Sequence, residues 1–331
     1  MTSLRRFSYA AFGVACTHLV FGAIVRISGS GMGCGDNWPK CYGEWLPRLN
    51  QSTLIIELSH RVLAALLLTT LLALLAAAYR QRDEAGVGGR GGVLRMAALA
   101  VTLGFSAAFL GAVTVKFGNP PWATVFHWTV AMSLVATTAA AVIRAGGFGG
   151  AAARLGGASA KTMRGARAGA AMALTAVVMG GLTAKYPGAS VACRSFPLCG
   201  RNPDVLLSSV WVQSIHRVLA VLVVLHLIGL MMGARRRREA PVVRRAVTIA
   251  LSLGVLQLLV AGAMIGMHLP PVLRSLHEAV GVSFWIATFV LAYLARIASG
   301  AAATSATPAV ASRTHELDEF DEMAGAAAVP R

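Results

Sequence analysis

Residues 60–64, His-Arg-Val-Leu-Ala, recur unchanged as residues 216–220. Each copy opens a long apolar run, and each follows a segment that holds two cysteines. A repeat of about 156 residues is too long for the period of a solenoid and indicates a duplicated domain. The sequence therefore predicts two comparable halves, each with a site of its own.

The composition indicates a membrane protein. Of the 331 residues, 56% are hydrophobic and only 13% are charged. The apolar residues come in blocks of about twenty, the helix length that crosses ~30 Å of hydrocarbon. We keep the first block as a membrane helix and not a cleaved signal, because it lacks a small-residue cleavage site. The blocks predict eight transmembrane helices, four in each half, at residues 6–27, 58–79, 94–115, 123–144, 165–184, 211–233, 244–266 and 275–298.

The predicted fold class is therefore an all-α integral membrane protein, with eight transmembrane helices arranged as two tandem pseudo-symmetric four-helix bundles. We expect an N-terminal bundle at residues 1–148, a linker rich in Gly and Ala at 149–164, and a C-terminal bundle at 165–298. Residues 299–331 are rich in Ala, Ser and Thr and then become acidic. Such a composition predicts a disordered cytoplasmic tail.

The basic residues predict the orientation. Most of the 30 lysines and arginines lie near the N-terminus and in the loops on the same side of the membrane, so both termini should be cytoplasmic. We expect a multi-pass protein of the cell membrane, with the lipid bilayer as its partner and its sites near the outer face. The net charge of +17 does not indicate nucleic-acid binding, because these charges lie in short juxtamembrane loops without interleaved aromatic residues.

Four of the five cysteines form two local pairs in the outward loops. Cys34 and Cys41 share the first such loop, and Cys193 and Cys199 share the third. An oxidising compartment favours a disulfide in each pair. Zinc is the weaker alternative, because the spacings are wider than in usual zinc sites and no histidine lies close by. A redox role for the first pair stays open, whereas Cys16 is expected to be a small apolar residue inside a span.

Four histidines occupy matched positions. His60, His127, His216 and His277 each fall at the outer end of an even-numbered span, and a Pro-Pro pair precedes the second histidine of each half by the same interval. Two imidazoles from neighbouring helices can hold the iron of a flat macrocycle from both faces, and bundle cores are a usual place for such sites. Each half is thus predicted to hold one haem. Zinc is less favoured, since further converging ligands are not evident.

The remaining histidines lack matched partners, and none is assigned a ligand role: His18, His226, His268 and His315. Arg61 and Arg217 directly follow their histidines. We expect these arginines either to pair with haem propionates or to anchor their helices at the membrane interface.

The symmetry breaks at one carboxylate. Glu57 precedes His60 by three residues and shares its helix face, whereas the corresponding residue of the second half is Gln213. An electron-carrying site has no need of an acid, but proton abstraction or the stabilisation of a developing cation does. The alternative is an acid at a helix N-terminus, where acids are common.

Residues 26–41, Arg-Ile-Ser-Gly-Ser-Gly-Met-Gly-Cys-Gly-Asp-Asn-Trp-Pro-Lys-Cys, and residues 57–61, Glu-Leu-Ser-His-Arg, resemble the first-loop and second-helix signature of heme A synthases. The resemblance covers about residues 5–298. Met32 stands where another aliphatic residue is expected, and the tail has no counterpart in the family. In the second half the match rests on fewer residues: Cys193, Cys199, His216, Arg217 and His277.

The resemblance implies an enzyme that oxidises the methyl group on ring D of haem O to a formyl group, giving haem A. It implies that His60 and His127 hold the haem O substrate, with Glu57 as base or electrostatic stabiliser, and that His216 and His277 hold a resident haem b. The pair Cys34 and Cys41 would shape the loop above the site or relay electrons. The implied partners are a haem O synthase and cytochrome oxidase assembly factors.

Two other classes of protein share some of these features. A di-haem b-type electron-transfer protein is the main alternative, but it usually carries its haems at two depths, whereas the four histidines lie at one. A transporter built from repeats is less favoured, because such repeats are often inverted in the membrane, while a repeat of four spans is parallel.

Overall fold

The computed structural model describes the backbone of residues 2–325 and the side chains of residues 2–300, and all long elements in this part of the chain are helices. Eight of them are long and apolar enough to cross a membrane, which confirms the predicted all-α membrane class and the number of spans. They are α1 (Thr2–Ile27), α2 (Ser52–Arg80), α3 (Val93–Lys116), α4 (Pro121–Arg144), α6 (Ala160–Lys185), α7 (Leu207–Arg236), α8 (Pro241–Gly266) and the first part of α9 (Pro271–Gly325).

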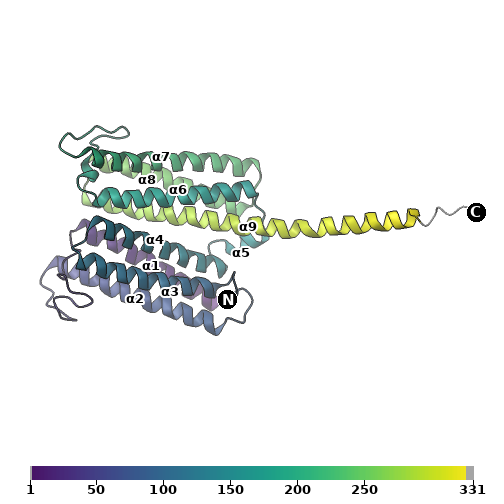
Figure 1. The fold of residues 1–331 in the computed structure, drawn as a ribbon, viewed down its shortest axis with the longest axis horizontal. Helices are drawn as coiled ribbons and strands as arrows, with labels where there is room; N and C mark the ends of the chain where they lie inside the picture. The colour runs from purple at the N-terminus through teal and green to yellow at the C-terminus, as the bar shows by residue number, and fades with distance from the viewer. Residues whose placement is uncertain (1, 326–331) are drawn as a thin grey trace, which may run out of the picture.

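The helices pack as two groups of four. In the first group, α1 contacts α2, α2 contacts α3, α3 contacts α4, and α4 closes the ring on α1. Helices α6 to α9 make the same ring. Figure 1 shows the two groups side by side, with both cysteine-bearing loops at one end and the short helix α5 (Gly150–Leu155) at the other. This arrangement is consistent with the predicted tandem repeat.

Two of the predicted segments contain helix. The predicted linker, residues 149–164, contains α5 and the first turn of α6, where the Ser159 side chain accepts a hydrogen bond from the N–H of Thr162. The predicted disordered tail, residues 299–331, begins inside α9, which continues to Gly325. Alanine has the highest helix propensity, so the Ala-rich start of this segment extends the helix. Residues 326–331 lie outside the described residues.

The halves also match in a turn. Gly118 and Asn119 link α3 to α4 with φ of 69° and 59°, and His268 and Leu269 link α8 to α9 with φ of 60° and 63°. In both turns the second residue donates its N–H to a carbonyl five residues earlier. Glycine and asparagine tolerate this left-handed backbone, whereas histidine and leucine are strained there. The second half thus keeps the turn without its favourable residues.

The two groups meet along α4 and α9. The indole N–H of Trp285 donates to the carbonyl of Met132 at 3.2 Å, and the guanidinium of Arg144 bonds the Tyr293 hydroxyl and the Gly92 carbonyl. Buried apolar residues of both halves form one continuous cluster around this contact. Large apolar side chains such as Phe105, Phe109, Leu225 and Leu259 remain exposed, which suits a surface covered by lipid.

Candidate functional site

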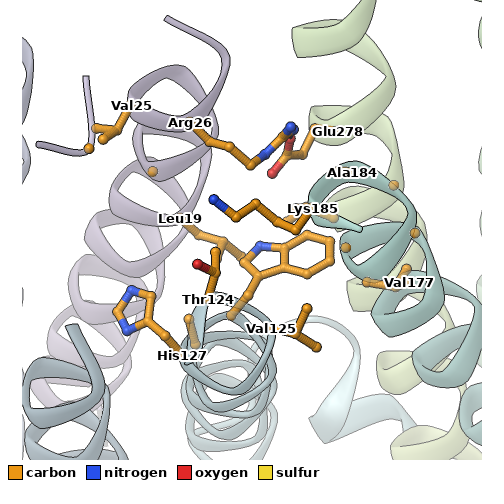
Figure 2. Close-up of a pocket in the computed structure, with 18 of the residues that line it drawn as sticks. Leu19, Val25, Arg26, Thr124, Val125, His127, Val177, Ala184, Lys185 and Glu278 are labelled. Carbon is orange, nitrogen blue, oxygen red and sulfur yellow. The ribbon is translucent and has the colours of Figure 1, made fainter. Parts of the chain in front are cut away.

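One large cavity lies between the helices of both halves. Its volume is about 1120 Å³, above the ~300–1,000 Å³ usual for small-molecule sites. All four histidines with matched positions line this cavity, as do Glu57, Arg61, Arg217 and Cys41. The structure therefore brings the predicted site residues of the two halves to a single cavity, and Figure 2 shows its central part.

Two histidines are held in the same way. The Nδ1 of His127 lies 2.9 Å from the carbonyl oxygen of Ala107, and the Nδ1 of His216 lies 2.9 Å from that of Ala176. A ring that donates its Nδ1–H to a carbonyl presents its Nε2 lone pair to a metal, and such bonds orient metal-ligating histidines. In both rings the Nδ1–H is thus engaged by a carbonyl, which leaves Nε2 as the nitrogen able to bind a metal or accept a proton.

The other two matched histidines have different surroundings. His277 lies 3.2 Å from the side-chain nitrogen of Gln257 on α8. His60 stacks on His18 of α1, with ring centroids 4.2 Å apart and an interplanar angle of 11°. Among the described residues, neither the buried His60 Nδ1 nor the buried His18 Nε2 has a hydrogen-bond partner. His18, to which sequence reasoning assigned no ligand role, is thus part of the site; the available signal was its place as an ionisable residue inside a span.

The histidines form one pair in each half. His60 of α2 and His127 of α4 line the cavity from the first half, and His216 of α7 and His277 of α9 line it from the second. Glycines make room for the rings. A Cβ at Gly22 would lie 3.3 Å from the Cε1 of His60, and one at Gly180 would lie 2.9 Å from that of His216.

Glu57 fastens the first cysteine loop to α2. It is only 3% exposed. Its Oε2 accepts a hydrogen bond from the N–H of Cys34 at 2.8 Å, and its Oε1 accepts one from Arg61 at 2.6 Å. In the second half, Gln213 accepts a hydrogen bond from the N–H of Cys193 at 2.6 Å. The two side chains thus make the same contact with the first cysteine of each loop, but Glu57 is charged and also bonds Arg61, whereas the Gln213 amide nitrogen lies 3.5 Å from the carbonyl oxygen of Ser190.

Arg61 and Arg217 also hold the loops. Arg61 donates to the carbonyls of Asn37, Pro39 and Lys40 at 2.8–3.2 Å. Arg217 donates in the same way to three carbonyls of the second loop, those of Cys193, Ser195 and Leu198. Neither alternative considered from the sequence, pairing with haem propionates or anchoring the helix at the membrane interface, included this role. It depends on how each loop folds back over its helix.

The predicted disulfides are both present. Cys34 bonds Cys41 and Cys193 bonds Cys199, with Cα–Cα distances of 4.5 and 4.6 Å. Cys34 and Cys41 are almost fully buried, so the first bridge is packed against the end of α2. Cys16 has a free thiol within α1, as expected.

A charged cluster that the sequence did not predict lies at the seam between the halves. Arg26, in the last turn of α1, forms an ion pair with Glu278 of α9. Lys185, the last residue of α6, extends toward α1 beside this pair (Figure 2). Arg26 opens the stretch 26–41, but nothing in the sequence places it beside Lys185 and Glu278, because the three residues are more than 90 residues apart in the chain.

Comparisons with known proteins cover most of the chain. The COX15-CtaA family model, described as cytochrome oxidase assembly protein, matches residues 5–55 and 50–289. A heme A synthase from Geobacillus kaustophilus is 29% identical over 306 residues, which is 89% of this chain and 92% of the relative. One from Geobacillus thermodenitrificans is 29% identical over 75% of this chain and 77% of its own length, and one from Bacillus cereus is 30% identical over 73% and 77%.

Proposed function

Because the chain belongs to the cytochrome oxidase assembly protein family, we propose that it is a heme A synthase, a membrane oxidoreductase that converts haem O to haem A. The reaction oxidises the methyl group on ring D to a formyl group, through two successive oxidations and the loss of water from a hydrated aldehyde. The observation that carries the proposal is the presence of two histidine pairs in one apolar cavity of a chain that resembles heme A synthases over 89% of its length.

The histidines fit haem ligation. His127 and His216 have their Nδ1 atoms on backbone carbonyls, so each has its Nε2 free to bind iron. In our proposal His60 and His127 hold the haem O substrate, and His216 and His277 hold a resident haem b. Haem b, when bound, supplies a one-electron redox centre. The protein contributes the ligands, the apolar walls that exclude water and the orientation of the substrate.

Glu57 distinguishes the proposed substrate site from the haem b site. Its carboxylate is buried, lines the cavity and already accepts hydrogen bonds on both oxygens. This bonding favours electrostatic stabilisation of positive charge that develops at the reacting carbon over proton abstraction. A neutral amide suffices at Gln213, where no substrate is oxidised.

The first cysteine loop acts as a cover in this proposal. The Cys34–Cys41 bridge is buried, which limits the access that thiol–disulfide exchange requires. Cys41 lines the cavity and Arg61 binds three carbonyls of the loop. These contacts support a role in shaping the roof of the site over a role in relaying electrons.

We place the protein in the cell membrane with both termini in the cytoplasm, on the distribution of its basic residues. The cysteine loops and the site then lie near the outer face. A haem O synthase would supply the substrate, and cytochrome oxidase assembly factors would receive the product.

The decisive experiment is to express the chain with a haem O synthase in a host that lacks haem A. The extracted haems are then separated by chromatography with mass detection. Haem A or its hydroxylated precursor is the expected product. Bound haem b with haem O left untouched, under conditions in which a known heme A synthase works, would instead indicate a di-haem electron-transfer protein.

A further inference from the structure

The cavity carries an excess of positive charge. Its lining includes two acidic side chains, Glu57 and Glu278, and five basic ones, Arg26, Arg61, Lys185, Arg217 and Arg274. Charges in an apolar environment are costly unless they are paired. An anionic group on the molecule that fills the cavity is therefore expected to meet some of these cations.

Three of the cations are already engaged: Arg26 pairs with Glu278, and the two arginines beside the histidines hold the cysteine loops. Arg61 bonds Glu57 and three carbonyls of the first loop, and Arg217 bonds three carbonyls of the second. Releasing either side chain would give up three hydrogen bonds to loop carbonyls, each worth about 0.5–1.5 kcal/mol. The arginines beside the histidines are thus poorly placed to bind a ligand's carboxylates.

Lys185, in contrast to these arginines, has no ion-pair partner among the described residues. It lines the cavity, lies near Arg26 and points from α6 toward α1 (Figure 2). The only acid at this place, Glu278, is already bound to Arg26. The seam therefore presents an ammonium group without a counter-ion, beside a guanidinium group.

The helices place these two cations at the level where haem carboxylates would reach. Lys185 follows Gly180, which packs on the ring of His216, by five residues, and Arg26 follows Gly22, which packs on His60, by four. At 1.5 Å per residue, the Cα atoms of Lys185 and Arg26 lie roughly 6–8 Å farther along their helices than these glycines, toward the cysteine loops. Both cations therefore lie on the loop side of the histidine rings, where an anionic group of a haem held by those rings would meet them.

We propose that Lys185, assisted by Arg26, binds a propionate carboxylate of a haem in this cavity. The inference rests on the proposed function, because it takes a haem as the ligand. In this proposal Lys185 and Arg26, and not Arg61 and Arg217, are the propionate partners. The seam between the halves is then part of the binding site.

The test compares two probes, protohaem and its dimethyl ester, in which the propionates are neutral. Each is titrated into the purified, haem-depleted full-length protein in detergent, and the absorption spectrum reports binding. Lys185→Gln should weaken protohaem binding about tenfold, the loss expected for one charge-assisted hydrogen bond, and leave ester binding unchanged. Lys185→Arg should restore most of the affinity for protohaem.

Lys116→Gln is the matched control, since Lys116 also ends a spanning helix near the cysteine loops but is 73% exposed; it should change neither affinity. Ester binding also reports folding in every variant. An equal loss for both probes, or no loss in Lys185→Gln, would overturn the inference. If the unaltered protein binds protohaem but forms no haem A from haem O, the proposed function fails while the carboxylate site stands.

Discussion

Glu57 and Gln213 make the same contact in the two halves: each accepts a hydrogen bond from the backbone N–H of the first cysteine in its disulfide loop. The distances are 2.8 and 2.6 Å. An amide is therefore sufficient to hold such a loop, and the negative charge of Glu57 is an additional feature of the first half. This relationship separates the structural role of the residue from its chemical one.

Glu57→Gln should therefore keep the loop and haem binding but lower haem A production about 100-fold, the usual cost of removing one stabilising group from a transition state. Haem chromatography and the absorption spectrum of the purified variant measure the two effects. Gln213→Glu is the matched control and should leave the product level unchanged. Normal haem A production by Glu57→Gln would remove the charge from the mechanism.

Loss of Arg217 should affect stability more than haem content. Arg217→Gln removes three hydrogen bonds to the second loop, and we expect the free energy of unfolding to fall by about 1–3 kcal/mol. Thermal unfolding in detergent and proteolysis of the loop measure this change. Arg194→Gln, which breaks the exposed pair with Asp204, should cost less. Complete haem loss with an intact loop would instead assign Arg217 to haem binding.

The second-half histidines should control the spectrum of a resident haem. His216→Met replaces one nitrogen ligand by a thioether and should shift the absorption bands and raise the reduction potential. His226→Gln is the control, because His226 lies on the same helix but bonds the carbonyl of Gly165. An unaltered spectrum in His216→Met would contradict the assignment of haem b to this half.

Replacing His268 in the turn before α9 should stabilise the protein. His268→Gly relieves a side chain at φ of 60° and should raise the free energy of unfolding by about 1 kcal/mol. Gly118→Ala makes the reverse change at the matched turn and should lower it by a similar amount. Equal melting temperatures for the unaltered protein and both variants would show that a side chain at these two positions costs no stability.

Glu239 should make the end of the molecule opposite the cysteine loops sensitive to acid. Burial raises the pKa of this carboxyl, but hydrogen bonds from Ser159, Thr162 and Arg237 outweigh it and hold the pKa below its ordinary value. The group therefore stabilises the fold above the unfolded-state pKa of ~4.3, and this contribution is lost as pH falls through the lower folded pKa. Glu239→Gln should melt at a lower temperature than the unaltered protein at pH 7. The difference should shrink toward pH 3; a constant difference would contradict this account.

The sequence by itself determined the elements and the repeat. The eight spans could be predicted because the thickness of the hydrocarbon layer sets the length of each apolar block. The disulfides could be predicted because the two cysteines of each pair lie close together within one loop. The four matched histidines could be identified because the duplication places them at equivalent positions in their spans.

Only the tertiary structure decided what the charged side chains contact. Arg61 and Arg217 reach carbonyls more than 18 residues away because each loop folds back over its helix, and His18 meets His60 because α1 packs on α2. Arg26 and Glu278 are 252 residues apart in the chain. Periodicity describes one helix at a time, whereas such contacts depend on which faces of separate helices meet, and that is settled by packing across the seam.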